Sequence, residues 1–283
     1  MGNGRRTWLL LVLAAVTACG AVTATPPAAP GSRTPEPTAA AGSRTPEPTV
    51  AAGSGTREPT WSPHAGYKLT FDDEFNGTTL GSDWTPGWLG TGITGPVNLM
   101  ETAAYRSANV TEKGGTLNLT LARATVTSGR GTYPYTGALV TTRGHFTFTY
   151  GYVEWRVYLP KSAGGLVADW PALWADGTGT WPSTGELDVM EGLNGNAAGH
   201  FISPSGSAGV FTTGPVSGWH TFGAAWQQGM VTYYYDGQQV GAITKGITGD
   251  PMFLVMDNTI AATSPSASSF PAVMRVDWVR VWS

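Results

Sequence analysis

Three carboxylates, Glu186, Asp188 and Glu191, lie within six positions of one another, in a chain with only 12% charged residues. The residues between them are apolar and favour a strand, in which alternate side chains share a face, so Glu186 and Asp188 point the same way. Glu191 has the wrong parity for that face. It joins them only if one extra residue is absorbed near Val189–Met190 as a β-bulge, a device enriched beside active sites. The sequence therefore predicts a bulged strand with three acids on one surface.

Carboxylates packed this closely do not ionise independently, because their mutual repulsion raises at least one pKa. A protonated acid beside an ionised carboxylate is what retaining glycoside hydrolysis requires, with the two groups about 5–5.5 Å apart. Glu186 and Glu191 reach that separation only if the strand is concave toward the substrate. Two other uses of the same residues stay open at this point. One is a Ca²⁺ site, since this ion prefers carboxylate oxygens, and the other is a charged strand facing solvent.

The composition excludes several other classes of function. A formal net charge of −3 predicts no basic surface for nucleic acid. The single cysteine, Cys19, permits no intramolecular disulfide, and neither Cys/His metal spacing nor a phosphate-binding Gly loop occurs in the right context. The chain has 12 Trp, whose rings stack on sugars as well as packing in cores, so this number favours a carbohydrate ligand.

Residues 1–19 are typical of an export signal: Arg5-Arg6 precede an apolar run from Trp8 to Val16 that is too short to span a bilayer. Val16-Thr-Ala-Cys19 resembles a bacterial lipobox, which would make Cys19 the lipidated first residue of an exported protein. Cleavage after Ala24 would instead remove Cys19 and release a secreted protein. We expect an extracellular location in either case, with membrane contact only through a lipid at Cys19.

Residues 20–62 are rich in Ala, Pro, Thr, Gly and Ser, and a repeat starts at positions 31, 42 and 53. Proline-rich sequence with almost nothing apolar to bury predicts a disordered tether. We assign residues 63–283 to one folded domain.

Strand-like alternation recurs through that domain, separated by Gly-containing turns, and no convincing amphipathic helix interrupts it. Asp236-Gly237 predicts a tight hairpin, since Gly tolerates positive φ. The pattern specifies an all-β sandwich or jelly roll. The alternating runs lie at residues 117–121, 146–150, 153–159, 222–226, 231–235 and 274–278.

Trp170, Trp174 and Trp181 lie just before the acidic strand, and His200 follows it. Each Trp is as compatible with core packing as with sugar contact, but clustering beside the acids favours the cleft. A lone histidine is more often structural than ligand-binding, and we retain both interpretations of His200.

These segments together resemble glycoside hydrolase family 16, in the family's order and from Tyr67 to the C-terminus. The resemblance rests on the motifs at Tyr67–Gly77, Phe146–Arg156, Trp170–Trp174, Gly185–Glu191, Tyr233–Gly237 and Val276–Trp282. The acidic motif with its bulge is similar to the laminarinase, agarase and galactanase branches.

The resemblance implies a curved β-jelly roll whose concave face carries an open cleft that cuts a β-linked polysaccharide internally, with retention. Glu186 would be the nucleophile, Glu191 the acid/base, and Asp188 would hydrogen-bond the nucleophile. Four other residues would contact the substrate besides His200: Trp170, Trp174, Trp181 and Asn98.

The substrate is less well specified, because residues 192–203 and 256–262 depart from the familiar laminarinase pattern. We expect β-1,3-glucan or mixed β-1,3/1,4-glucan. The alternatives are a galactan- or agar-type hydrolase, a transglycosylase of the same family, and a carbohydrate-binding jelly roll without catalysis.

The resemblance implies no cofactor for catalysis. Many members bind one structural Ca²⁺ on the convex face, and Glu74 and Asp277 match those ligand positions. We expect the protein to act as a monomer.

Overall fold

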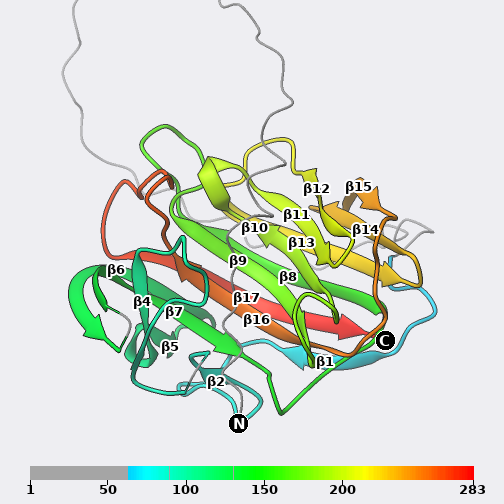
Figure 1. Ribbon diagram of the computed structural model, residues 1–283, viewed down its shortest axis with the longest axis horizontal. Helices are drawn as coiled ribbons and strands as arrows, with labels where there is room; N and C mark the ends of the chain where they lie inside the picture. Colours follow the sequence, from blue (N-terminus) through cyan, green and yellow to red (C-terminus); the bar gives the residue numbers. More distant parts are fainter. Residues whose placement is uncertain (1–62, 89, 130) are drawn as a thin grey trace, which may run out of the picture. The chain divides into compact units, whose positions relative to one another are not determined.

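A computed structural model of the chain describes residues 63–88, 90–129 and 131–283. The predicted signal, lipidation site and tether, residues 1–62, lie outside the described residues. The described part is all-β, as predicted, and its seventeen strands form one hydrogen-bonded network (Figure 1). Two short 3₁₀ helices, Ser107–Asn109 and Leu193–Gly195, interrupt the strands. No helix among the described residues is long and apolar enough to cross a membrane.

One layer, which we name sheet A, is antiparallel and has β8 and β17 at its centre. Strand β17 pairs with β8 on one side and with β6 and β1 on the other, and β8 continues through β13 and β14 to β15. The strands are β1 (Leu69–Asp73), β5 (Val110–Glu112), β6 (Leu117–Ser128), β8 (Gly151–Leu159), β13 (Gly218–Gln227), β14 (Met230–Tyr235), β15 (Gln238–Ile243) and β17 (Ala272–Trp282).

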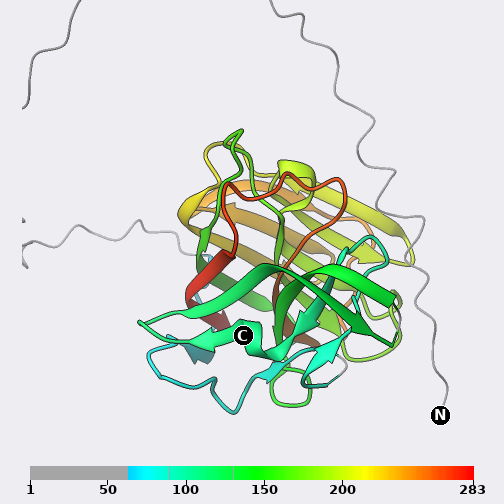
Figure 2. The same cartoon turned by 90° about the vertical axis from the view of Figure 1, so that its left-hand side faces the viewer.

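The second layer, sheet B, carries the acidic strand, in the order β12-β11-β10-β9-β16-β7-β2. Its strands are β2 (Thr85–Pro86), β7 (Gly131–Thr141), β9 (Trp170–Gly177), β10 (Glu186–Glu191), β11 (Ala198–Ser203), β12 (Gly206–Phe211) and β16 (Met252–Thr259). The long β6–β7 hairpin, which faces the viewer in Figure 2, joins the two sheets. The short β3 (Ile93–Thr94) and β4 (Ala103–Arg106) extend it, and β4 runs parallel to β7.

The main hydrophobic core lies between the sheets. Alternate residues of β8 in sheet A, from Val153 to Leu159, meet Leu173 of β9 and Leu187 of β10 in sheet B. This period-2 burial is the physical basis of the strand predictions. It also means that the residues between them point outward, away from the core.

Two local predictions had opposite outcomes. The Asp236-Gly237 turn is confirmed, since both residues have positive φ (46° and 72°) and join β14 to β15. The predicted strand at 146–150 is wrong, because only Phe148 forms a bridge, to Met252, and Tyr150 has a φ of 59°. The rings of Phe146 and Phe148 stack with their centroids 6.3 Å apart, although the two residues belong to no regular strand.

The two ends of the described domain lie together. The backbone N–H of Ser283 donates to the carbonyl of Lys68 at 2.9 Å, and β1 pairs with the end of β17.

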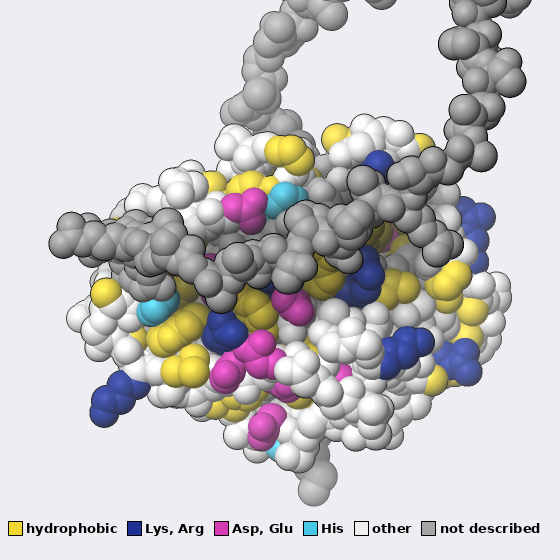
Figure 3. All heavy atoms as spheres, turned by 180° about the vertical axis from the view of Figure 1, so that it is seen from behind, with side chains coloured by type: hydrophobic (Ala, Val, Ile, Leu, Met, Phe, Trp, Pro, Cys, Tyr) yellow, Lys and Arg dark blue, Asp and Glu magenta, His cyan; other side chains and the backbone are white. Residues whose placement is uncertain are grey.

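One face of the molecule shows how its charge is distributed. Acidic side chains lie down the middle of this face among hydrophobic ones, and Lys and Arg form small separate groups (Figure 3). The described part of this face therefore has no broad basic tract.

Candidate active site

Strand β10 contains the predicted bulge. Against β9, Asp188 pairs with Trp174 and Met190 with Leu173, so Val189 is the extra residue. The register against β11 shifts over the same interval. Leu187 and Met190 are fully buried in the core. The three acids therefore share the outward side of sheet B, which we name the carboxylate face.

Two indole N–H groups hold the outer carboxylates in place. Trp181 Nε1 donates to Glu186 Oε2 at 2.8 Å, and Trp170 Nε1 donates to Glu191 Oε1 at 3.0 Å. Trp170 opens β9, the neighbour of β10, whereas Trp181 lies in the loop that joins these two strands. Each carboxylate thus keeps a fixed orientation, which a reaction between positioned groups requires.

Asp188 lies between these two acids in the strand and is 5% exposed. Burial, followed by the negative charges of Glu186 and Glu191, raises the pKa of Asp188 well above its usual value. The protonated form of Asp188 is therefore favoured beside its two neighbours, as the spacing predicted.

His200 lies opposite Asp188 on β11, and its Nδ1 is 3.1 Å from Glu191 Oε2. Burial lowers the pKa of His200, but the contact with Glu191 and the charges of Glu191 and Asp188 outweigh it, so the pKa is raised. The structure thus places His200 directly against the expected acid/base.

A second buried network, which the sequence analysis did not identify, lies next to these acids. Asp257 on β16 accepts hydrogen bonds from Trp174 Nε1 at 2.7 Å and from the Tyr105 hydroxyl at 3.3 Å. Burial, helped by the negative charge of Glu191, raises the pKa of Asp257. The two hydrogen bonds oppose this shift, and the resulting pKa is about 7. Burial and the charge of Asp257 raise the pKa of nearby Glu101 well above its usual value. An acid placed directly after the apolar run 252–256 was the signal that could have revealed this network.

The structure does not fit the expected calcium pair. Glu74 forms an ion pair with Arg280, and Asp277 forms one with Arg156, so both carboxylates are already neutralised by guanidinium groups. Among the described residues, the one group with metal-ligand spacing is Asp188, Glu191 and His200, whose ligand atoms lie within 4.8 Å of one another.

Comparison with known families decides the classification. The model of glycosyl hydrolases family 16 matches residues 100–280, nearly two thirds of the chain. The chain belongs to this family. The recognition made from the sequence motifs is confirmed.

Two similar proteins are polysaccharide-degrading enzymes by name. The chain is 30% identical over 248 residues to the endo-1,3-1,4-beta-glycanase EglC of Rhizobium meliloti, covering 76% of this chain and 51% of EglC. It is 28% identical over 270 residues to the glucan endo-1,3-beta-glucosidase A1 of Niallia circulans, covering 77% of this chain and 38% of that protein. The chain thus spans about half or less of these relatives.

Solved family 16 structures have the same fold. The laminarinase catalytic domain of Thermotoga maritima superposes with a TM-score of 0.66 at 26% identity, covering 77% of this chain and 98% of that one. These neighbours confirm the jelly-roll-like fold.

The remaining expected family 16 contacts can now be located. Trp170 and Trp174 are only 5% and 6% exposed, and Trp174 stacks on Trp88 with ring centroids 5.4 Å apart. Most of their ring surface is therefore covered, which leaves the half-buried Trp181 as the better candidate for stacking on a sugar. Asn98 is buried, and its Oδ1 accepts the Met100 N–H at 2.9 Å, so it stabilises its own loop. Sugar contact by these residues stays a prediction.

Proposed function

We propose that this domain is a retaining, endo-acting hydrolase of β-1,3-glucan or mixed β-1,3/1,4-glucan. The observation that carries the proposal is the bulge at Val189, because it brings Glu186, Asp188 and Glu191 to one face. The carboxylates of the two glutamates are held there by separate indole donors. The names of EglC and of the Niallia circulans enzyme support the substrate class. The carboxylate face would form the floor of an open cleft for the polysaccharide.

In the first step, Glu186 attacks the anomeric carbon while Glu191 donates its proton to the leaving oxygen. The glycosidic bond breaks as the bond between the sugar and Glu186 forms. In the second step Glu191 removes a proton from water, which displaces Glu186 and regenerates both groups.

The neighbours of the two glutamates support this assignment of roles. Asp188, with its raised pKa, keeps its proton beside Glu186 and so adds no second negative charge next to the nucleophile. His200, at 3.1 Å from Glu191, stabilises the carboxylate that remains after Glu191 has given up its proton.

The decisive variant is Glu186→Gln, which keeps the shape and the Trp181 hydrogen bond but removes the nucleophilic charge. We expect turnover of laminarin to fall by at least about a thousandfold, with binding of laminarin retained. Glu154→Gln is the matched control, because Glu154 lies on the outward side of sheet A, where its oxygen accepts a hydrogen bond from the Tyr152 hydroxyl. If Glu186→Gln keeps more than a few per cent of the activity, Glu186 is not the nucleophile.

Azide distinguishes the roles of the two glutamates. In Glu186→Ala, azide would displace the leaving group once and yield a glycosyl azide of inverted configuration. In Glu191→Ala, it would attack the sugar bound to Glu186 and yield the retained configuration. Proton NMR of the products reads both outcomes, and the opposite pattern would reverse the assignment.

A panel of polysaccharides separates the alternatives. New reducing ends from laminarin or lichenan support the proposed substrate class, whereas activity only on agarose or galactan would support the other branches of the family. Binding to one of these polysaccharides without cleavage of any would support a carbohydrate-binding module. Longer products at high acceptor concentration would indicate transglycosylation.

We also propose that the domain is exported. The support is in the sequence of residues 1–19 and of the tether at 20–62. Metabolic labelling with palmitate, compared between the wild type and Cys19→Ala, tests the lipid anchor.

A further inference from the structure

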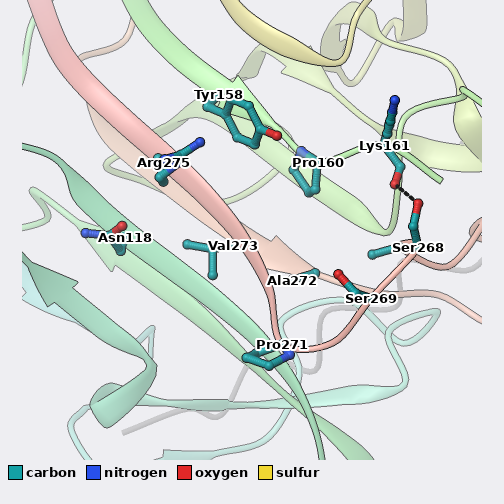
Figure 4. A pocket seen from close by; sticks show the side chains of 11 residues that line it. Asn118, Tyr158, Pro160, Lys161, Ser268, Ser269, Pro271, Ala272, Val273 and Arg275 are labelled. Carbon is teal, nitrogen blue, oxygen red and sulfur yellow. Dashed lines mark hydrogen bonds between the residues drawn. The ribbon is translucent and has the colours of Figure 1, made fainter. Parts of the chain in front are cut away.

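A pocket of about 470 Å³ lies on sheet A, away from the carboxylate face. It is lined by β6, by the end of β8 and the residues that follow it, and by the loop that leads into β17 (Figure 4). Tyr158 and Arg275 form part of its wall. Their chain neighbours Val157, Leu159 and Met274 are fully buried in the core between the sheets, so Tyr158 and Arg275 project outward. The pocket and the carboxylate face therefore lie on opposite sides of the sandwich.

The charge of this pocket is entirely positive. Its lining includes Lys161 and Arg275 and no Asp or Glu. Among the described residues neither cation has a carboxylate within 4.0 Å, whereas Arg156 and Arg280 on the same sheet are both paired with acids. Arg275 lies on the wall of the pocket, and the exposed Lys161 lies at its rim with the ammonium group pointing away from the other lining residues (Figure 4), so the pocket keeps an uncompensated positive charge that attracts anions.

The pocket is also held in shape. The guanidinium of Arg275 stacks over the Tyr158 ring at 4.1 Å and over Trp219 at 5.5 Å, which fixes its plane and leaves its edge free to donate hydrogen bonds. The Ser268 hydroxyl donates to the Lys161 carbonyl at 2.9 Å and ties the two walls together. Ser269 and Asn118 add neutral polar groups to the lining.

We propose that this pocket binds an anionic sugar unit, carrying a carboxylate or a sulfate, of a polysaccharide. The volume lies in the range of small-molecule sites, about 300–1,000 Å³. The Arg275 guanidinium provides charge-assisted donors for the anion, and the charge of Lys161 at the rim adds to the attraction. The exposed hydroxyls of Ser268 and Ser269 would recognise the sugar hydroxyls. The site uses no residue of the carboxylate face, so it does not depend on the proposed hydrolase activity.

Titration calorimetry on the full chain tests the proposal with three oligosaccharides of similar length, trigalacturonate, a sulfated chondroitin oligosaccharide and neutral galactotriose, and with inorganic phosphate as a fourth probe. We expect at least one anionic probe to bind and galactotriose to bind at least tenfold more weakly. Binding of trigalacturonate identifies a carboxylated unit, and binding of the sulfated probe alone identifies a sulfated one. If no anionic probe binds, or if inorganic phosphate binds as tightly as the anionic sugars, the proposal is overturned.

Two variants locate the binding. Lys161→Gln/Arg275→Gln should lower the affinity for the anionic probe by at least about tenfold, since the loss of one charge-assisted hydrogen bond lowers affinity by roughly that factor. Ser269→Glu places a negative charge at the exposed rim and leaves the stacked Arg275 intact. This variant should also bind the anionic probe more weakly than the wild type. It therefore keeps the test valid if the double variant unfolds.

The matched control is Lys68→Gln/Lys245→Gln, which removes two exposed positive charges that do not line the pocket. This variant should bind the anionic probe as the wild type does. An equal loss in the control would show non-specific attraction, and unchanged binding in both pocket variants would place the ligand elsewhere.

Discussion

The buried carboxyl of Asp257 makes the free energy of unfolding depend on pH. Its pKa of about 7, above the usual 3.8, means that the folded state holds the proton more tightly than the unfolded state. The folded protein therefore incurs a cost that begins above pH 4, grows as the pH rises to about 7 and is constant above that. At about 1.36 kcal/mol per pKa unit, the full cost is about 4 kcal/mol.

We expect Asp257→Asn to remove much of this cost at pH 8 and little of it at pH 4, although the amide supplies one acceptor oxygen instead of two to Trp174 and Tyr105. Urea unfolding at pH 4, 6 and 8 measures the difference from the wild type. Asp250→Asn, at an exposed position, is the control and should show no such trend. A stability difference that does not change with pH would contradict the assignment.

Among single residues, the sequence predicted best those side chains whose spacing is fixed by the chemistry they would perform. The pattern of Glu186, Asp188 and Glu191 predicted its own bulge, because the acids share a face in no other way. Asp257 and Glu101 were missed because their proximity depends on a contact between β16 and the loop before β4, which lies far away in the chain. The ion pairs of Glu74 and Asp277 were missed for a related reason, since their arginine partners come from other strands.

Among the structural elements, β10 permits a sharp test of parity. Deleting Val189 removes the extra residue, so Met190 still faces the core and Glu191 falls on the same side as Glu186 in a regular strand. We expect this variant to fold with a loss of about 1.5–3 kcal/mol from the missing buried valine, and to keep measurable laminarin hydrolysis.

Deleting both Val189 and Met190 is the matched variant. It turns the Glu191 side chain toward the core, and activity should be lost entirely. Near-ultraviolet circular dichroism monitors folding, and reducing-end assays monitor activity. Complete inactivity of a folded Val189 deletion would show that the bulge does more than correct the parity.

The hydrophobic periodicity of the sequence predicted other strands well, because the period-2 burial of β8 and β17 is visible in the residues themselves. Residues 146–150 show the limit of this signal. Their aromatic alternation is that of a strand, but the backbone turns there and the rings pack on one another.

For the molecule as a whole, the arginine pairs of Glu74 and Asp277 predict indifference to calcium. A thermal melt in 5 mM EDTA should match one in 5 mM CaCl₂ to within roughly 1 °C, because a ligand that stabilises the native state must bind it. A melting temperature that rises with calcium, and that no longer does so in Glu74→Gln, would restore the expected site.

The pairing of Lys68 with Ser283 has a consequence for how the domain can be attached to other structures. The first and last strands of the fold end side by side, so a tether, a partner domain or a solid support joined next to either strand would attach to the same region of the surface. The enzyme would then present the same side to an insoluble glycan whichever end carries the attachment, and amino- and carboxy-terminal fusions should be interchangeable in engineering.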